Sequence, residues 1–122
     1  MAPVDISMSL KEELALISEG VKRALQSEDA RRAITGWSRR FRIVVDRKRK
    51  YTVVVEEGEV RVEKGSSGRT DFEVFTTRET LEQILNGELS LIRAFMEKKV
   101  EIKGKISDED VAKLYKLLSW AM

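Results

Sequence analysis

The N-terminal part of the chain carries apolar residues at helical spacing. Charged residues lie between apolar positions three or four residues apart, which predicts an amphipathic helix of about 18 residues. Ser27, Glu28 and Asp29 then offer the cap and acidic first turn of a short second helix that reaches Ile34. The apolar stripe of the first helix consists of Leu10, Leu14, Ile17, Val21 and Leu25.

The period of the pattern changes to two after this helical part. Residues 38–45, 51–57 and 59–64 each alternate apolar with polar or charged positions, as half-buried strands do. Glu57-Gly58 forms a tight connection between the last two runs, so the three runs predict an antiparallel meander. The loop KGSSGRT then leads to a fourth strand, DFEVF, at 71–75.

The last third combines three helical patterns with one more strand. Thr76 with Glu79 predicts a capping box for a short helix, and Ser107 with Asp110 predicts another for the final helix. Between them, LSLIRAFMEKKVEIKG at 89–104 changes from helical spacing to strand alternation. The order α-β-β-β-β-α-α-β-α predicts an α+β fold with helices against one face of a sheet.

The composition removes much of the usual catalytic chemistry. The chain has no cysteine and no histidine, which excludes disulfides, thiol nucleophiles, imidazole bases and the usual zinc ligands. Carboxylate runs such as Glu12-Glu13 and Asp108-Glu109-Asp110 lie near predicted helix starts or turns, where they complement a helix dipole or solvate a loop. We therefore expect no enzyme, no metal site and no cofactor, and one domain over residues 1–122.

The sequence also bears on where the protein works. Its start lacks a basic region followed by an uninterrupted apolar run, and no segment approaches the roughly 20 apolar residues that span a bilayer. We expect a cytoplasmic protein. Charged residues make up 36% of the chain, against about 25% in typical domains, a pattern that with the missing cysteine resembles proteins from hot environments.

Positive charge is concentrated between residues 31 and 50. This window holds nine Lys or Arg against one acid, although the net charge of the chain is only +2. One interpretation is a site for phosphates, whether of a nucleic acid, a lipid headgroup or a nucleotide-containing ligand. The other is an ordinary hairpin whose cations cover a solvent-facing strand and a turn. The candidate residues for an anionic headgroup or phosphate are Arg40, Arg42, Arg47, Lys48, Arg49 and Lys50.

The helices of the last third are rich in apolar residues for so small a sheet. Leu91 and Leu117 widen their stripes beyond one narrow face, and Trp120 leaves an apolar end on the chain. These side chains either fill a core or line a space for a ligand.

The segment TDFEVFTTRETLEQILNGELSLIRAFMEKKVEIKGKISDEDVAKL, residues 70–114, resembles the C-terminal half of the sterol carrier protein 2 (SCP-2) domain. An aspartate-led strand, a short helix ending in Gly, an Ala-Phe pair, a Lys-rich strand and a final helix follow in the same order. A Gly common in the family before Lys99 is absent here. The matching positions are Asp71, Leu81, Leu85, Gly87, Leu89, Ala94, Phe95, Lys99, Val100, Ile102, Gly104, Ala112, Lys113 and Leu114.

The resemblance implies a five-stranded mixed sheet covered on one face by helices, with an apolar tunnel between the two layers. Family members bind sterols, fatty acids, fatty acyl-CoAs and phospholipids without a cofactor or covalent chemistry. On this basis the helix that bears Ile92 and Phe95 would form a tunnel wall, with Val100 and Ile102 as its floor. The expected lipid-binding residues are Leu14, Ile17, Phe41, Ile43, Phe75, Leu91, Ile92, Phe95, Met96, Val100, Ile102, Leu117 and Trp120.

Two functional hypotheses follow from the sequence. The first is non-enzymatic binding and intermembrane transfer of a fatty acid, fatty acyl-CoA, isoprenoid or sterol-like lipid in an apolar tunnel. The second is a protein- or nucleic-acid-interaction module with a filled core that uses the basic hairpin 39–50. Under the first, the partners are a lipid or acyl-CoA ligand and, transiently, an anionic membrane surface; nucleic acid is disfavoured, and the chain is a monomer or a homodimer.

Overall fold

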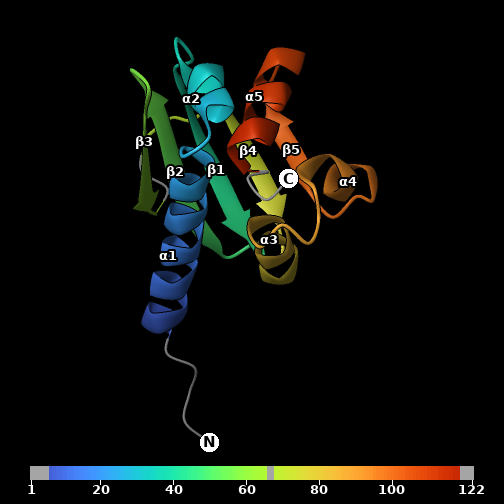
Figure 1. Cartoon of the computed structure of the whole chain (residues 1–122). Coiled ribbons are helices and arrows are strands. Elements are labelled where there is room, and N and C mark those ends of the chain that lie inside the picture. The colour runs from blue at the N-terminus through green and yellow to red at the C-terminus, as the bar shows by residue number, and fades with distance from the viewer. Residues whose placement is uncertain (1–5, 66–67, 119–122) are drawn as a thin grey trace, which may run out of the picture.

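The computed structural model describes residues 6–65 and 68–118 (Figure 1). Its elements follow the predicted order α-β-β-β-β-α-α-β-α, except that the first helical part consists of two helices, as the cap at Ser27 predicted. In chain order the elements are α1 (Ile6–Ala24), α2 (Glu28–Ile34), β1 (Arg39–Val45), β2 (Arg49–Glu56), β3 (Glu59–Lys64), β4 (Phe72–Thr76), α3 (Arg78–Leu85), α4 (Leu91–Met96), β5 (Glu101–Gly104) and α5 (Asp108–Leu118).

The strands form one mixed sheet in the order β3-β2-β1-β4-β5. The pairs β1–β2, β2–β3 and β4–β5 are antiparallel, and the central pair β1–β4 is parallel. Figure 1 shows α1, α2 and α5 on the same side of this sheet. The α+β class and the five-stranded mixed sheet expected from the sequence are therefore confirmed.

Alternation along the strands decides which side chains enter the core. On β1, Phe41 and Ile43 face the helices and are almost fully buried, whereas Arg40 and Arg42 face away from them. Phe41 stacks on Phe72 of the parallel neighbour, with ring centroids 4.9 Å apart and planes 7° from parallel. The parallel pair at the centre of the sheet is thus also the centre of the core.

Two hairpin turns keep this meander in register. The turn between β2 and β3 uses Glu57 and Gly58, both at positive φ, as the sequence predicted. The turn between β1 and β2 places two residues with side chains, Asp46 and Arg47, at positive φ of 53° and 60°. The Lys48 N–H closes this turn by donating to the Val45 carbonyl oxygen.

The described residues between β3 and β4 contact β2 and β1 on the face that the helices leave open. Thr52 on β2 donates a hydrogen bond to the Gly65 carbonyl at 2.8 Å, and Arg42 on β1 donates one to the Gly68 carbonyl at 3.3 Å. The Asp71 N–H then donates to the Arg40 carbonyl at 2.7 Å. β4 then pairs in parallel with β1.

The two capping boxes predicted from the sequence have different outcomes: one is confirmed, and the other helix begins one residue later than predicted. Ser107 and Asp110 form the predicted capping box, in which each side chain accepts from the backbone N–H of the other. The predicted box at Thr76 is wrong: Thr76 stays in β4, paired with Val45, and Thr77 caps α3. Strand β4 therefore ends one residue later than the sequence pattern indicated, at Thr76, and α3 begins one residue later.

A buried polar contact fixes the last helix to the start of β1. The Asp110 carboxylate, on α5, accepts a hydrogen bond from the Trp37 indole at 2.7 Å and one from Arg39 at 3.1 Å. Burial by itself raises the pKa of Asp110, but the hydrogen bonds from Trp37 and Ser107 and the charge of Arg39 hold it below its usual range. Asp110 is therefore held as a carboxylate in the folded chain.

We predict that Asp110→Asn destabilises the protein in a pH-dependent way. A pKa lower in the folded than in the unfolded chain means that the carboxylate's stabilisation is complete above about pH 4 and disappears as the pH falls through the folded value. Urea unfolding should show a loss of about 1–3 kcal/mol at pH 7 and a shrinking loss below pH 4. Asp108→Asn, an exposed neighbour in the same turn, should change stability by about 0.5 kcal/mol or less. A deficit for Asp110→Asn that is the same at all pH values would contradict this assignment.

Candidate functional site

The largest continuous apolar region lies between the sheet and the helices. All five described helices contribute to it: α1 through Ile17, α2 through Ile34, α3 through Leu81, α4 through Leu91 and α5 through Leu114. The sheet contributes its inward positions. The buried cluster consists of Ile17, Val21, Ala24, Ile34, Trp37, Phe41, Ile43, Val45, Tyr51, Val53, Val55, Phe72, Val74, Leu81, Ile84, Leu85, Leu91, Ala94, Val100, Leu114 and Leu117.

Of the thirteen expected lipid-binding residues, six belong to this buried cluster. Two further expected residues, Leu14 and Ile102, are partly buried and pack against it. These eight side chains come from α1, β1, α4, β5 with its preceding residue, and α5, so they converge from segments far apart in the sequence. The six that belong to the buried cluster are Ile17, Phe41, Ile43, Leu91, Val100 and Leu117.

The other expected residues lie elsewhere. Phe75 faces the helix-free side of the sheet, because it follows the inward-facing Val74 by one residue. Ile92, Phe95 and Met96 are 48%, 52% and 75% exposed. They lie at the surface because the six-residue α4 turns Leu91 and Ala94 toward the core and presents the rest of its side chains outward. Trp120 lies outside the described residues.

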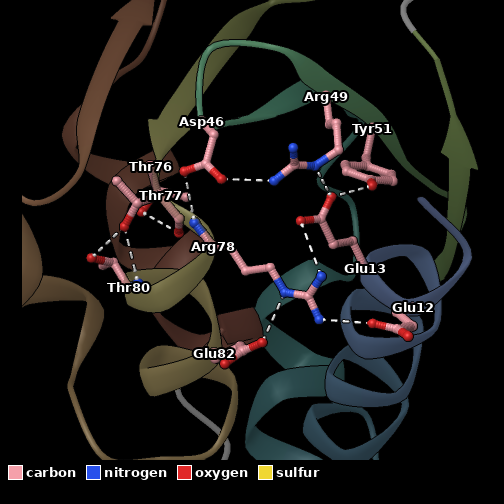
Figure 2. A network of polar contacts seen from close by, with 10 residues as sticks. All are labelled: Glu12, Glu13, Asp46, Arg49, Tyr51, Thr76, Thr77, Arg78, Thr80 and Glu82. Carbon is pink, nitrogen blue, oxygen red and sulfur yellow. Dashed lines mark hydrogen bonds and ion pairs between the residues drawn. The ribbon is translucent and has the colours of Figure 1, made fainter. Parts of the chain in front are cut away.

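A buried carboxylate adjoins the apolar cluster. Glu13, on α1, is fully buried, and its Oε1 accepts hydrogen bonds from the Tyr51 hydroxyl at 2.5 Å and from Arg49 Nε at 2.6 Å (Figure 2). Its Oε2 accepts no hydrogen bond from the described residues and lies 3.8 Å from Arg78 Nη1. Glu13 therefore joins α1 to β2 directly and to α3 through charge.

The two arginines around Glu13 have further partners, which extend the network to the surface. Arg49 donates to Asp46 in the β1–β2 turn at 2.7 Å, and Arg78 donates to Glu82 at 2.9 Å. Arg78 also reaches Glu12 at 3.0 Å. Figure 2 shows these side chains converging from α1, α3 and the first hairpin.

The tyrosine and the two arginines of this network keep their protons at neutral pH. Burial, then the hydrogen bond to Glu13 and its charge, raise the pKa of the Tyr51 hydroxyl, so it stays protonated. The hydrogen bond to Glu13 raises the pKa of Arg49, and those to Glu82 and Glu12 raise that of Arg78. Fixed charges and a protonated phenol suit an anchor between elements better than a proton-transfer site.

The sequence interpretation missed this anchor. It assigned Glu12-Glu13 to dipole or solvation roles, and for Glu13 that expectation is wrong. A signal was present, since Glu13 lies three residues after Leu10 and four before Ile17, on the same face of α1. Arg49 likewise shares a strand face with Tyr51, two residues later.

The six cations expected to form an anion site are divided by the fold. Arg49 is bound in the Glu13 network, and Arg42 pairs with Glu73 on β4 at 3.1 Å. The Arg40 guanidinium lies beside Gly68 on the helix-free face. Exposed and without an ion pair to the described residues are the three near the turn, Arg47, Lys48 and Lys50.

Two of these turn cations line a groove on the helix-free face of the sheet. The groove has a volume of about 770 Å³, and Val44 and Phe75 contribute apolar surface to it. Lys103 Nζ lies 5.4 Å from the centroid of the Phe75 ring, a cation–π contact. The cations that line the groove are Arg47, Lys50, Lys98, Lys99 and Lys103, and the acids are Asp46, Glu73 and Glu101.

Comparison with known proteins supplies the family. The model of the SCP-2 sterol transfer family matches residues 19–115, most of the chain. This chain belongs to the SCP-2 sterol transfer family. No curated protein matches the sequence. Membership in this family supports lipid binding or transfer as the general class of function.

Solved structures agree with the SCP-2 fold at low sequence identity. The ubiquinone synthesis protein UbiJ-SCP2 shares 18% identity with a TM-score of 0.62, covering 98% of this chain and 94% of its own. Palmitated SCP2L2 from Aedes aegypti shares 19% identity with a TM-score of 0.54, covering 66% of this chain and 72% of its own.

The SCP-2 fold also occurs inside a larger enzyme. The sec-alkylsulfatase Pisa1 from Pseudomonas sp. shares 22% identity with a TM-score of 0.59 over 72% of this chain. The chain spans only 14% of the length of that enzyme.

Within the described parts of this chain, no helix is long and apolar enough to cross a bilayer.

We predict that Glu13→Gln destabilises the protein far more than Glu12→Gln. Glutamine at 13 loses the charge that receives hydrogen bonds from Tyr51 and Arg49, which should lower the free energy of unfolding by about 2–3 kcal/mol. Glu12 has an exposed pair with Arg78, so its loss should cost less than about 1 kcal/mol. Urea unfolding at pH 7 measures both. Equal losses in the two variants would refute the anchoring role of Glu13.

Proposed function

We propose that this protein binds a lipid chain between its sheet and its helices and carries it between membranes without chemical change. Three observations support the proposal: membership in the SCP-2 sterol transfer family, the convergence of eight expected residues on one apolar layer, and a sequence without cysteine or histidine. We further propose that residues 1–122 act as one lipid-binding domain.

The weak attachment of α4 carries the proposal. This helix places only Leu91 and Ala94 in the buried cluster. Withdrawing Leu91 would cost roughly 1.5–3 kcal/mol, whereas each CH₂ of an entering chain gains about 0.8 kcal/mol. About half a dozen buried CH₂ groups would therefore offset the opening of α4 and leave a favourable balance. Lipid would enter where α4 borders α3 and α5.

The class of ligand follows from the apolar side chains of the layer between sheet and helices and from the exposed cations near the β1–β2 turn. The layer offers apolar side chains to a saturated, isoprenoid or sterol-like body. An anionic headgroup, whether a fatty-acid carboxylate or the phosphates of an acyl-CoA, would remain at the surface, where Arg47, Lys48 and Lys50 are exposed and have no ion pair to the described residues. Fatty acids and fatty acyl-CoAs are therefore the first ligands to test.

One observation favours the second candidate, an interaction module with a filled core. Large side chains of the sheet, including Phe41, Tyr51 and Phe72, are almost fully buried, and the rings of Phe41 and Phe72 stack on each other. In that case the exposed cations of the basic hairpin would bind an anionic partner, and the apolar layer would accept no ligand. The two candidates differ in whether lipid enters the core.

We predict that the purified protein takes up hexadecanoate with one-to-one stoichiometry in native mass spectrometry. Organic extraction should remove the added mass, and the lipid-free protein should unfold at a lower temperature than the loaded one, because ligand binding to the native state stabilises it. A lipid-free mass together with an unchanged melting temperature in both hexadecanoate and hexadecanoyl-CoA would refute the carrier proposal and favour the filled core.

We predict that Ala94→Met lowers hexadecanoate uptake, because it places a larger side chain where the lipid should lie. The matched control is Ala30→Met, since Ala30 is also a buried helical alanine but is not part of the apolar cluster. Titrations followed by native mass spectrometry should show at least about a tenfold weaker affinity for Ala94→Met, equivalent to about 1.4 kcal/mol, with Ala30→Met close to the parent. Equal affinities in folded variants would remove α4 from the binding site.

A further inference from the structure

Three large apolar side chains lie exposed together on α4. Ile92, Phe95 and Met96 are each about half exposed or more, and they fall within five consecutive positions. Single exposed apolar residues are ordinary on protein surfaces, but clustered ones mark a surface that contacts another apolar phase. Figure 1 shows α4 at the edge of the molecule, beyond the edge strand β5.

Basic residues directly adjoin this apolar cluster. Lys98 and Lys99 follow α4 in the chain and line the groove on the helix-free face, which also contains Arg47 and Lys50. Lys98 is held there at a positive φ of 61°. α4 and the groove therefore adjoin through Lys98 and Lys99, and we call Ile92, Phe95, Met96 and the residues that line the groove together the α4 corner.

The α4 corner has more unpaired cations than unpaired acids. Glu73 is paired with Arg42, and Asp46 with Arg49. Among the described residues, Arg47, Lys50 and Lys98 have no ion pair. The surface is thus apolar at α4 and positive beside it.

We propose that the α4 corner docks on anionic lipid bilayers. Ile92, Phe95 and Met96 would enter the boundary between headgroups and acyl chains, and the cations of the groove would contact lipid phosphates and carboxylates. The groove is lined by four lysines and one arginine. Lysine is depleted at protein–protein interfaces, so this composition favours a bilayer over a protein partner. The inference goes beyond the carrier proposal, because docking requires no lipid in the core.

The first experiment is flotation of the lipid-extracted protein with two kinds of vesicle. Binding is expected to vesicles of phosphatidylcholine and phosphatidylserine in equal parts, to weaken with salt, and to be much lower on phosphatidylcholine alone. Phe95→Ser, and separately Lys50→Glu with Lys98→Glu, should each lower the partition coefficient at least about tenfold. The matched controls are Val111→Ser, an exposed apolar residue of α5, and Lys22→Glu, an exposed lysine of α1, and both should bind like the parent.

The second experiment reports on insertion directly. Because the chain has no cysteine, Met96→Cys and Val111→Cys each allow a single nitrobenzoxadiazole label. Only the label at 96 should shift its emission to the blue and gain intensity when anionic vesicles are added. Circular dichroism confirms that each variant is folded.

Several results would overturn the docking proposal. One is equal vesicle binding by the α4 variants and their controls, and another is equal response of the two labels. A third is a change of oligomeric state on Phe95→Ser without vesicles, seen by size-exclusion chromatography, which would make the α4 corner a contact between copies of this chain. Failure of the carrier proposal would leave all these measurements unchanged, since they use protein freed of lipid.

Discussion

A carboxylate buried beneath the first helix constrains how the fold closes. A charge removed from water is tolerated only where donors meet it, and Glu13 finds them in Tyr51 and Arg49 of β2, with Arg78 of α3 nearby. If α1 shifted along the sheet, this charge would remain buried without its donors. The apolar stripe of α1 could pack in several registers, since hydrophobic contacts are not directional, but the carboxylate permits one. The packing of α1 and α3 on the sheet depends on that contact.

Among the residues that the structure describes, no comparable contact holds α4. Its place rests on Leu91 and Ala94 in the core and on the Ser90 cap, while α1, α3 and α5 are each tied by a buried or partly buried ionic contact. Elements with few buried contacts open at lower free energy than the rest of a fold. The unequal distribution of polar anchors therefore leaves α4 as the element best suited to move when a ligand enters.

Local patterns in the sequence predicted the elements and the faces of the strands, because alternation and helical spacing report directly on burial. Phe41 and Ile43 face inward, and Arg40 and Arg42 outward, as the period of two requires. Apart from Glu13, whose position on the apolar stripe of α1 was a local signal, what failed depended on contacts between distant segments.

The misassigned residues include one missed local signal and two features that no local pattern could predict. Glu13 was judged by its residue type, although its position on the apolar stripe of α1 pointed inward. The orientation of α4 was not predictable, because its sequence is apolar on both sides and only the edge of the sheet decides which side is buried. The groove on the helix-free face is lined by Lys50 from β2 and by Lys98 from the segment before β5, and no local pattern predicts that these two residues line one groove.

Both proposals assign a role to the same short helix, α4. Under the carrier proposal α4 moves away from the core to admit a lipid, and under the docking proposal its outer face enters a bilayer. Contact with the bilayer would then favour the open position of α4 through Leu91, which is buried in the closed position and would gain an apolar surrounding once withdrawn from the core. Linkage is reciprocal: whatever free energy docking contributes to opening, opening contributes to docking. Because a lipid in the core and a bilayer at the outer face would both favour the open position of α4, loading and docking would strengthen each other, and net transfer would run down the concentration gradient of the lipid itself.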